Sequence, residues 1–176
     1  MLTRLFAKFH QADRKLFIKI NTGLHRKFLN FLLYYVTHLG GATFTISACL
    51  ISWYFLPRVW GTTALMSLTT LAASHIPVAI AKKTYPRLRP YLALPDTRTF
   101  RNPLKDHSFP SGHTTAIFSV TVPFMIIFPL LILPLLPIAL LVALSRIYLG
   151  LHYPSDVLAG GVIGTLTAFG TVALWP

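Results

Sequence analysis

Residues Thr114 to Leu144 form a run of 31 residues without a single charge, and this run sets the strongest limit on the fold. A hydrocarbon core about 30 Å thick is crossed by about 20 apolar residues in a helix, so the run is too long for one crossing. Three prolines, Pro129, Pro134 and Pro137, indicate where the chain turns back. The run therefore predicts two membrane-spanning helices.

Three further apolar runs have the length of a crossing. Phe28 to Leu56 carries no charge but contains Gly40-Gly41, which predicts a short lead-in followed by a span that ends at Pro57. Val59 to Ala81 and Val157 to Trp175 predict one span each. The expected fold is an all-α integral membrane helical bundle of about five transmembrane helices, in a multi-pass protein of the cell membrane.

The composition supports lipid as the solvent of this chain. Only 11% of the residues are charged and 54% are hydrophobic, whereas roughly a quarter are charged in soluble domains. The 176 residues leave room for one domain, 1–176. The net charge of +12 raises the question of nucleic acid. However, the basic residues lie between apolar runs and form no separate basic domain, so we expect anionic membrane lipids and no nucleic acid as partners. Nothing in the sequence predicts an oligomeric state.

The N-terminal segment, 1–25, predicts an amphipathic helix at the membrane surface. From Leu2 to Asn21, apolar residues recur at helical spacing. Five basic residues lie among them, namely Arg4, Lys8, Arg14, Lys15 and Lys19. Such a helix lies in the headgroup region, where basic side chains meet lipid phosphates; an amphipathic helix packed on protein is the alternative. Because no apolar core precedes a small-residue cleavage site, we expect no removable signal peptide.

The polar residues of the chain are expected on one side of the membrane. Five spans alternate sides, so the N-terminal helix, the long polar loop from Lys82 to Pro110 and the segment from Ser145 to Asp156 share one face. Of the 16 Lys and Arg residues, only Arg58 falls on the opposite face. A loop as long as 82–110 in so small a protein is usually functional. We therefore expect the chemistry at this face.

Two clusters at this face suit the binding of an oxyanion. Lys82 ends an apolar helix and Arg89 follows after six residues, so a turn could aim both at one anion. Ser111 and Gly112 stand just before an apolar helix, whose first backbone N–H groups form an anion site. His113 follows there, in a position to exchange a proton with the bound group.

The third cluster predicts a nucleophile. Arg146 ends the fourth span, and His152 and Asp156 flank Pro154 at the start of the fifth. An Asp four residues after a His can accept the proton of one imidazole nitrogen and leave the other nitrogen free to attack. The three clusters hold too few carboxylates for Mg²⁺ or Ca²⁺, and a zinc site would lack a third ligand. We expect neither a metal nor another cofactor.

Isolated basic and histidine residues have simpler explanations. Lys83 and Arg87, at the end of a span, are expected to extend their charged ends to lipid headgroups. Five histidines are expected to be interfacial or internally hydrogen-bonded, namely His10, His25, His38, His75 and His107.

Taken together, the three clusters resemble a known family. Lys82 to Pro90 matches the element K-x6-R-P, Pro110 to His113 matches P-S-G-H, and Ser145 to Asp156 matches S-R-x5-H-x3-D, in that order. The chain thus resembles the type 2 phosphatidic acid phosphatase (PAP2) superfamily, in its membrane lipid-phosphatase branch. Vanadium haloperoxidases and bacterial acid phosphatases are related to this superfamily.

The resemblance implies a metal-independent phosphatase that acts on a lipid. His152 would attack phosphorus to give a phosphohistidine, Asp156 would support it, and His113 would protonate the leaving oxygen. Five residues would hold the phosphate oxygens, namely Lys82, Arg89, Ser111, Gly112 and Arg146. The candidate substrates are phosphatidylglycerol phosphate, phosphatidic acid, a polyprenyl diphosphate and a lipid A phosphate.

Two alternative functions and two orientations stay open at this point. A phosphotransferase of the same family would pass the phosphate from His152 to another acceptor, and a non-catalytic carrier would bind the lipid phosphate without cleaving it. The positive-inside rule places the charged face in the cytoplasm, whereas the resemblance implies an extracytoplasmic or lumenal site. The sequence is compatible with both orientations.

Overall fold

The computed structural model describes residues 2–24, 26–99 and 106–176, and its regular elements in these ranges are all helices. His25 and the part of the long loop at 100–105 lie outside the described residues. The elements in chain order are α1 (Leu2–Asn21), α2 (Lys27–Val36), the 3-10 turn η1 (Thr37–Gly40), α3 (Ala42–Phe55), α4 (Arg58–Thr84), α5 (Pro90–Ala93), α6 (Gly112–Ile127), the 3-10 turn η2 (Pro129–Leu131), α7 (Ile132–Tyr148) and α8 (Pro154–Ala173). The all-α prediction is confirmed.

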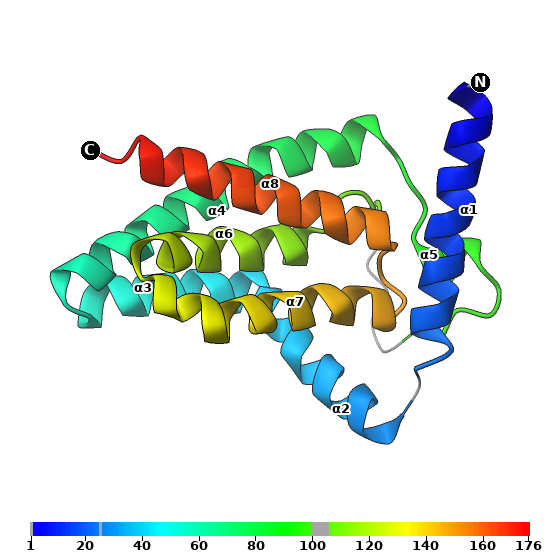
Figure 1. The fold of residues 1–176 in the computed structure, drawn as a ribbon, viewed down its shortest axis with the longest axis horizontal. Helices are drawn as coiled ribbons and strands as arrows, with labels where there is room; N and C mark the ends of the chain where they lie inside the picture. Colours follow the sequence, from blue (N-terminus) through cyan, green and yellow to red (C-terminus); the bar gives the residue numbers. More distant parts are fainter. Residues whose placement is uncertain (1, 25, 100–105) are drawn as a thin grey trace.

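Five apolar helices, α3, α4, α6, α7 and α8, run side by side as a bundle (Figure 1). Three helical segments are long and apolar enough to cross a membrane: Arg58–Thr84, Pro129–Tyr148 and Pro154–Ala173. The other two, α3 and α6, have 14 and 16 residues. At a rise of 1.5 Å per residue they extend over about 21 to 24 Å, which is less than a full hydrocarbon core.

The breaks between these helices fall at glycine and proline residues. The apolar run from Phe28 divides as predicted, because η1 ends at Gly40 and α3 begins at Ala42. The run from Thr114 turns back at the first of the three prolines that were expected to mark the turn, Pro129. The other two prolines lie inside α7, close to its start.

Helix α6 is the centre of the bundle and lies closest to α8. A Cβ atom on Gly160 would come within 2.6 Å of the Ser111 carbonyl oxygen, and one on Gly164 within 2.7 Å of the Thr115 carbonyl oxygen. Only glycine permits this close backbone approach. Small residues between membrane helices have the same effect, because they let the helix backbones come close together. At the same contact, the Ser111 N–H donates to the carbonyl oxygen of Asp156 at 3.0 Å. The starts of α6 and α8 are therefore held together.

The direction of the helices brings the polar segments to one end of the bundle. Helices α4 and α7 finish there, α6 and α8 begin there, and α1 lies across that end (Figure 1). One side of α1 packs against α7 and α8, with Asp13, Phe17 and Asn21 buried. In the N-terminal half of α1, Leu5 and Phe9 are exposed. The predicted amphipathic helix is thus present, and it packs on protein along one side.

Candidate active site

Lys82 and Arg89 point at one carboxylate, that of Asp106. Lys82 lies in the last turn of α4, and Arg89 is the residue directly before α5. Lys82 Nζ lies 2.5 Å from Asp106 Oδ2, and Arg89 Nη2 lies 2.6 Å from Asp106 Oδ1. Partial burial raises the pKa of Asp106, but the hydrogen bonds and charges of Lys82 and Arg89 outweigh it and lower this pKa to about 2. The two cations therefore share one anionic group, as the sequence suggested.

The start of α6 presents backbone donors. Ser111 caps the helix, because its Oγ accepts from the Thr114 N–H at 3.4 Å. The N–H groups of Gly112 and His113, in the first turn, have no acceptor within the helix. A Cβ atom on Gly112 would meet no protein atom within 4 Å, so packing does not require glycine here. The position leaves room for a group to approach the backbone.

Arg146 is a buried cation that forms no ion pair with the described residues. It lies in the last turn of α7, is 2% exposed, and donates from Nη1 to Thr37 Oγ1 at 2.7 Å. Its Nε and Nη2 atoms have no hydrogen-bond partner in the part of the chain that the structure describes. A buried guanidinium is stable only when it is paired, so such orphaned donors need an explanation. Arg146 also lies within electrostatic range of Arg89 and Asp106, so its free donors belong to the same cluster of charges.

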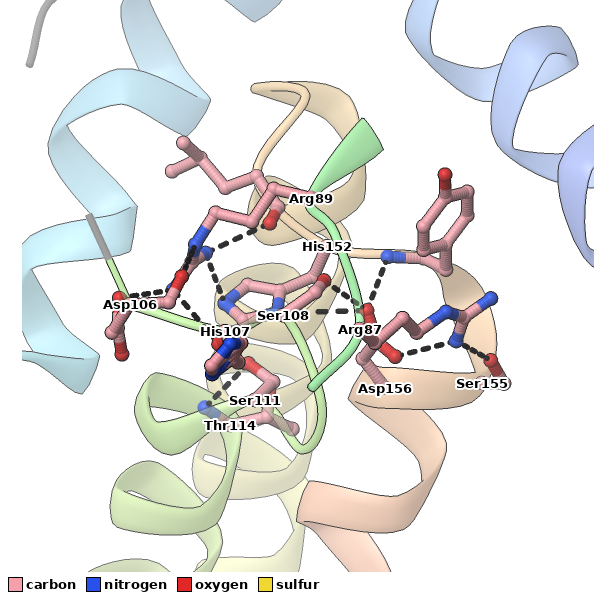
Figure 2. A network of polar contacts seen from close by, with 12 residues as sticks. Arg87, Arg89, Asp106, His107, Ser108, Ser111, Thr114, His152, Ser155 and Asp156 are labelled. Atoms are coloured by element: carbon pink, nitrogen blue, oxygen red, sulfur yellow. Dashed lines mark hydrogen bonds and ion pairs between the residues drawn. The ribbon is translucent and has the colours of Figure 1, made fainter. Parts of the chain in front are cut away.

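His152 lies in the loop between α7 and α8. Gly150 has a φ of 78°, in the left-handed region that favours glycine, and the turn it makes lets the Leu151 and His152 N–H groups bond to the Arg146 carbonyl. The ring is buried, and its Nε2 atom lies 3.1 Å from Arg89 Nη1 (Figure 2). Nε2 therefore faces the cations.

The other ring nitrogen of His152 faces Asp156. Nδ1 lies 3.7 Å from Asp156 Oδ2, which is longer than a hydrogen bond, and Nδ1 has no partner among the described residues. Catalytic hydrogen bonds are often long in the absence of substrate. Burial lowers the pKa of His152 to about 4; the charges of Arg146 and Arg89 act in the same direction, against the effect of Asp156. The imidazole is therefore neutral near pH 7.

His113, the second residue of α6, belongs to the same group. It is within electrostatic range of Arg146, His152 and Arg89. The structure thus brings all eight predicted site residues to the same end of the bundle: Lys82, Arg89, Ser111, Gly112, His113, Arg146, His152 and Asp156. In the described part of the chain, no group of three or more His, Cys, Asp or Glu side chains is close enough to hold a metal ion.

Sequence reasoning missed the residues that hold Asp156. This carboxylate is fully buried, and its Oδ2 accepts from Ser108 Oγ at 2.5 Å and from the Tyr153 N–H at 2.8 Å. Its Oδ1 accepts from Arg87 Nη1 at 2.6 Å (Figure 2). Ser108 and Arg87 precede Asp156 by 48 and 69 residues, so no local pattern indicated them.

The expectation that Arg87 extends to lipid headgroups is wrong. Its guanidinium forms ion pairs with Asp156 and Asp13, both at 2.6 Å, and lies 4.0 Å from the centre of the Tyr153 ring. Burial lowers the pKa of Arg87, but the charges and hydrogen bonds of Asp156 and Asp13 raise it further, so the net shift is upward. Protein carboxylates hold this side chain because it turns inward from the loop after α4. Lys83, by contrast, is exposed.

Of the remaining histidines that the structure describes, His75 fits the expectation of an internal hydrogen bond, and the other three make different contacts. His75 Nδ1 lies 2.8 Å from the Leu71 carbonyl oxygen, an internal hydrogen bond. His10 contacts the ring of Phe9, and His38 contacts that of Tyr34. His107 contributes its backbone carbonyl, which accepts from Lys82 Nζ at 2.9 Å.

Comparison with known proteins agrees with the fold and with the three motifs. The sequence profile described as the PAP2 superfamily matches residues 63–176, a range that includes all eight predicted site residues. The chain belongs to the PAP2 superfamily.

Similar proteins include lipid phosphatases. Phosphatidylglycerophosphatase B of Bacillus subtilis is 30% identical over 162 residues, which cover 83% of this chain and 75% of that protein. An undecaprenyl-diphosphatase of Sulfolobus acidocaldarius is 32% identical over 97 residues, or 54% of this chain and 47% of that one. The chain thus aligns with about half the length of the archaeal protein.

A solved structure shares the fold. The crystal structure of a transmembrane PAP2-type phosphatidylglycerolphosphate phosphatase from Bacillus subtilis superposes with a TM-score of 0.77 at 26% identity, covering 94% of this chain and 85% of that one. The helical bundle described above is therefore that of a transmembrane PAP2 protein.

Proposed function

We propose that this chain is a multi-pass phosphatase of the cell membrane that hydrolyses the terminal phosphate of a lipid phosphate or diphosphate. One observation carries the proposal: Arg146 is buried with two unpaired donors beside the neutral, buried ring of His152. A phosphate group supplies the missing negative charge, and charge stabilisation with positioning provides most of the catalysis of phosphoryl transfer. The substrates named for the two relatives are of this chemical class.

Binding of the phosphate uses donors from three parts of the chain. Arg146 offers Nε and Nη2, and the start of α6 offers the amides of Gly112 and His113. Arg89 and Lys82 complete the site once the phosphate replaces the Asp106 carboxylate. The planar guanidinium groups suit paired phosphate oxygens, and the ammonium acts as a point charge.

The first chemical step forms a phosphohistidine. The lone pair of His152 Nε2 forms the bond to phosphorus while the bond from phosphorus to the lipid oxygen breaks. His113, which gains a proton when the negatively charged phosphate binds beside it, donates that proton to the lipid oxygen, which leaves as an alcohol or as a shorter phosphate. Asp156 stabilises the positive charge that develops on the His152 ring through the Nδ1 side.

Water completes the reaction. Neutral His113 takes a proton from a water molecule, whose oxygen forms a bond to phosphorus. The bond between phosphorus and Nε2 breaks, its electron pair returns to His152, and phosphate leaves. His113 is then protonated again, as at the start, so the cycle balances.

The shape of the molecule fits a substrate anchored in lipid. The segments Arg58–Thr84, Pro129–Tyr148 and Pro154–Ala173 are long and apolar enough to cross the hydrocarbon core. With these segments in the membrane, the charged end of the bundle would lie in the headgroup layer. The exposed apolar residues and the basic residues of α1 would lie in that same layer, where they suit contact with membrane lipids. A lipid phosphate reaches the site while its tail stays in the bilayer.

A substrate panel with a trap for the intermediate tests the proposal. Purified protein in detergent micelles is assayed for phosphate release from phosphatidylglycerol phosphate, phosphatidic acid, a polyprenyl diphosphate and a lipid A phosphate, with and without a chelator. We expect release from at least one of them without added metal, and an acid-labile label on the protein after quenching with a ³²P-labelled substrate. His152→Ala should abolish both signals, and His10→Ala should retain them.

The same assay separates the alternative functions. Release of free phosphate without an added acceptor supports a hydrolase, and release that requires an alcohol or sugar acceptor would indicate a phosphotransferase. If His152→Ala still performed the function of the wild-type protein, the chain would be a carrier and the proposal would be wrong.

A further inference from the structure

Arg87 connects three parts of the chain that are far apart in sequence. From the link between α4 and α5, its Nη1 donates to Asp156 Oδ1 at 2.6 Å and to Ser155 Oγ at 2.7 Å (Figure 2). Its Nη2 donates to Asp13 Oδ2 at 2.6 Å. One guanidinium therefore joins α1 to the start of α8, where Asp156 lies.

Asp13 also binds the start of α8 directly. Its Oδ1 accepts from the Ser155 N–H at 2.9 Å, and its Oδ2 accepts from Ser155 Oγ at 2.6 Å. An aspartate that accepts from a backbone N–H in the first turn of a helix stabilises that turn. Helix α1 thus contributes a buried carboxylate to the place where α8 begins.

The charges in this group depend on Arg87. Asp13 is 5% exposed and Asp156 is 0% exposed, and a carboxylate so deeply buried stays ionised only when it is paired. In the described part of the chain, Arg87 is the one Lys or Arg side chain that forms an ion pair with either. Without it, two buried negative charges would face each other across the start of α8.

The orientation of Asp156 follows from the same contacts. Arg87 holds Oδ1, and Ser108 and the Tyr153 N–H hold Oδ2. These bonds leave Oδ2 as the oxygen nearest to His152 Nδ1, at 3.7 Å. In the proposed reaction the His152 ring becomes positively charged. An ionised Asp156 carboxylate, fixed beside Nδ1, stabilises that charge.

We infer that Arg87 is a positioning residue for the proposed reaction, and that α1, through Asp13, holds Arg87 against Asp156. This inference rests on the proposed function of His152 and Asp156. Arg87 itself does not touch the phosphate, since its Nη donors are directed to Asp13, Ser155 and Asp156. The N-terminal helix, which lies at the membrane surface, is thereby part of the support of the nucleophile.

Three variants test the inference with the full-length protein in micelles. Arg87→Gln removes the charge, and we expect kcat to fall about 10- to 100-fold, as for the loss of a hydrogen bond to a charged group. KM should stay within about twofold, because no contact to the substrate is removed. The acidic limb of the pH profile of kcat should move to higher pH, because Asp156 loses its cation and protonates more easily.

The other two variants separate charge from geometry. Arg87→Lys keeps a positive charge but cannot bridge both carboxylates with a planar fork. We therefore expect the acidic limb of its pH profile to return to the wild-type position, while kcat recovers only in part. Asp13→Asn should lower kcat about two- to tenfold, and the double variant with Arg87→Gln should be no worse than Arg87→Gln alone, because Asp13 acts through Arg87.

Matched controls come from exposed residues of the same types. Arg58→Gln at the start of α4 and Asp96→Asn in the loop after α5 should leave kcat, KM and the pH profile unchanged. Thermal unfolding in detergent checks that each variant folds. If Arg87→Gln does not fold, the kcat values and pH profiles of Arg87→Lys and Asp13→Asn test the inference instead.

Distinct outcomes separate the inference from the proposed function. An active wild-type protein whose Arg87 and Asp13 variants keep its kcat and pH profile would overturn the inference and leave the proposed function standing. Changes in KM alone would also overturn it, since they would place Arg87 on the substrate. A wild-type protein that releases no phosphate from any lipid of the panel would overturn both.

Discussion

Arg89 Nη2 donates to Asp106 Oδ1 at 2.6 Å, so a carboxylate of the chain itself sits on a cation that is proposed to bind phosphate. Lys82 holds the second oxygen of the same carboxylate at 2.5 Å. Asp106 is 52% exposed, which means that this side chain can turn away into solvent. If Arg89 and Lys82 bind phosphate as proposed, Asp106 competes with the substrate for them.

Removing this competitor should strengthen substrate binding. We expect Asp106→Asn to lower KM about two- to fivefold, the scale of a partly exposed ion pair, with little change in kcat. Inhibition by vanadate, which mimics phosphate, should become stronger by a similar factor. Asp96→Asn is the control, since that carboxylate is exposed in the loop after α5. A raised KM in Asp106→Asn would show instead that this carboxylate organises the two cations for binding.

Arg146 should be needed for activity and not for stability. Among the described residues, its buried guanidinium has no ion-pair partner and leaves two donors unpaired, so Met at this position removes a desolvation penalty while filling similar space. We expect Arg146→Met to unfold at the same temperature as the wild type or higher, and to lose phosphate release about 100-fold or more. Differential scanning fluorimetry and the release assay measure the two effects. Vanadate should raise the unfolding temperature of the wild type alone.

Arg58→Met is the matched control for this variant, since Arg58 is exposed at the opposite end of the bundle. Stability and activity should both stay at wild-type values. A strong loss of stability in Arg146→Met would mean that Arg146 has a structural role that its single bond to Thr37 does not show.

The leaving group should decide how much His113 matters. A lipid alkoxide needs a proton as it departs, and general acid catalysis contributes about 10²- to 10⁴-fold. A p-nitrophenolate leaves without one. His113→Ala should therefore slow hydrolysis of a lipid phosphate far more than that of p-nitrophenyl phosphate, whereas His152→Ala should abolish both. Equal losses on the two substrates in His113→Ala would argue against its role as the acid.

His152 should remain neutral well below pH 6.5. Burial lowers its pKa to about 4, so the imidazole lone pair is available at all pH values above that point and is lost only as the pH falls through it. NMR of ¹⁵N-labelled histidine in the micelle-bound protein follows the ring directly, with the spectrum of His152→Ala providing the assignment. We expect no protonation of this ring between pH 7.5 and 5. A titration midpoint above pH 6 would contradict the environment described here.

The sequence could predict the parts of the site that local spacing determines. His152 and Asp156 are four residues apart around a helix start, and Ser111 to His113 begin another helix, so their chemistry follows from neighbours in the chain. The convergence of the three motifs followed from counting apolar runs. The same count did not indicate how short two of the helices are, because α3 begins only after Gly40-Gly41 and α6 ends at Ile127, shortly before Pro129.

The supports of the site could not be predicted in this way. Arg87 meets Asp13 and Asp156 across 74 and 69 residues, and its position at the end of a span favours contact with lipid headgroups in the absence of other information. The carboxylate of Asp106 meets Arg89 only because the loop folds back over it. Such pairings depend on the tertiary packing, so no regular spacing in the sequence predicts them.

The hydrogen bond from the Ser111 N–H to the Asp156 carbonyl, together with the glycine contacts behind it, makes the starts of α6 and α8 one mechanical unit. The amides that we propose to bind phosphate oxygens and the carboxylate that we propose to support the His152 ring are therefore held at a fixed spacing. A phosphate bound at the start of α6 would then meet the His152 ring at a spacing that these two helix starts set in advance.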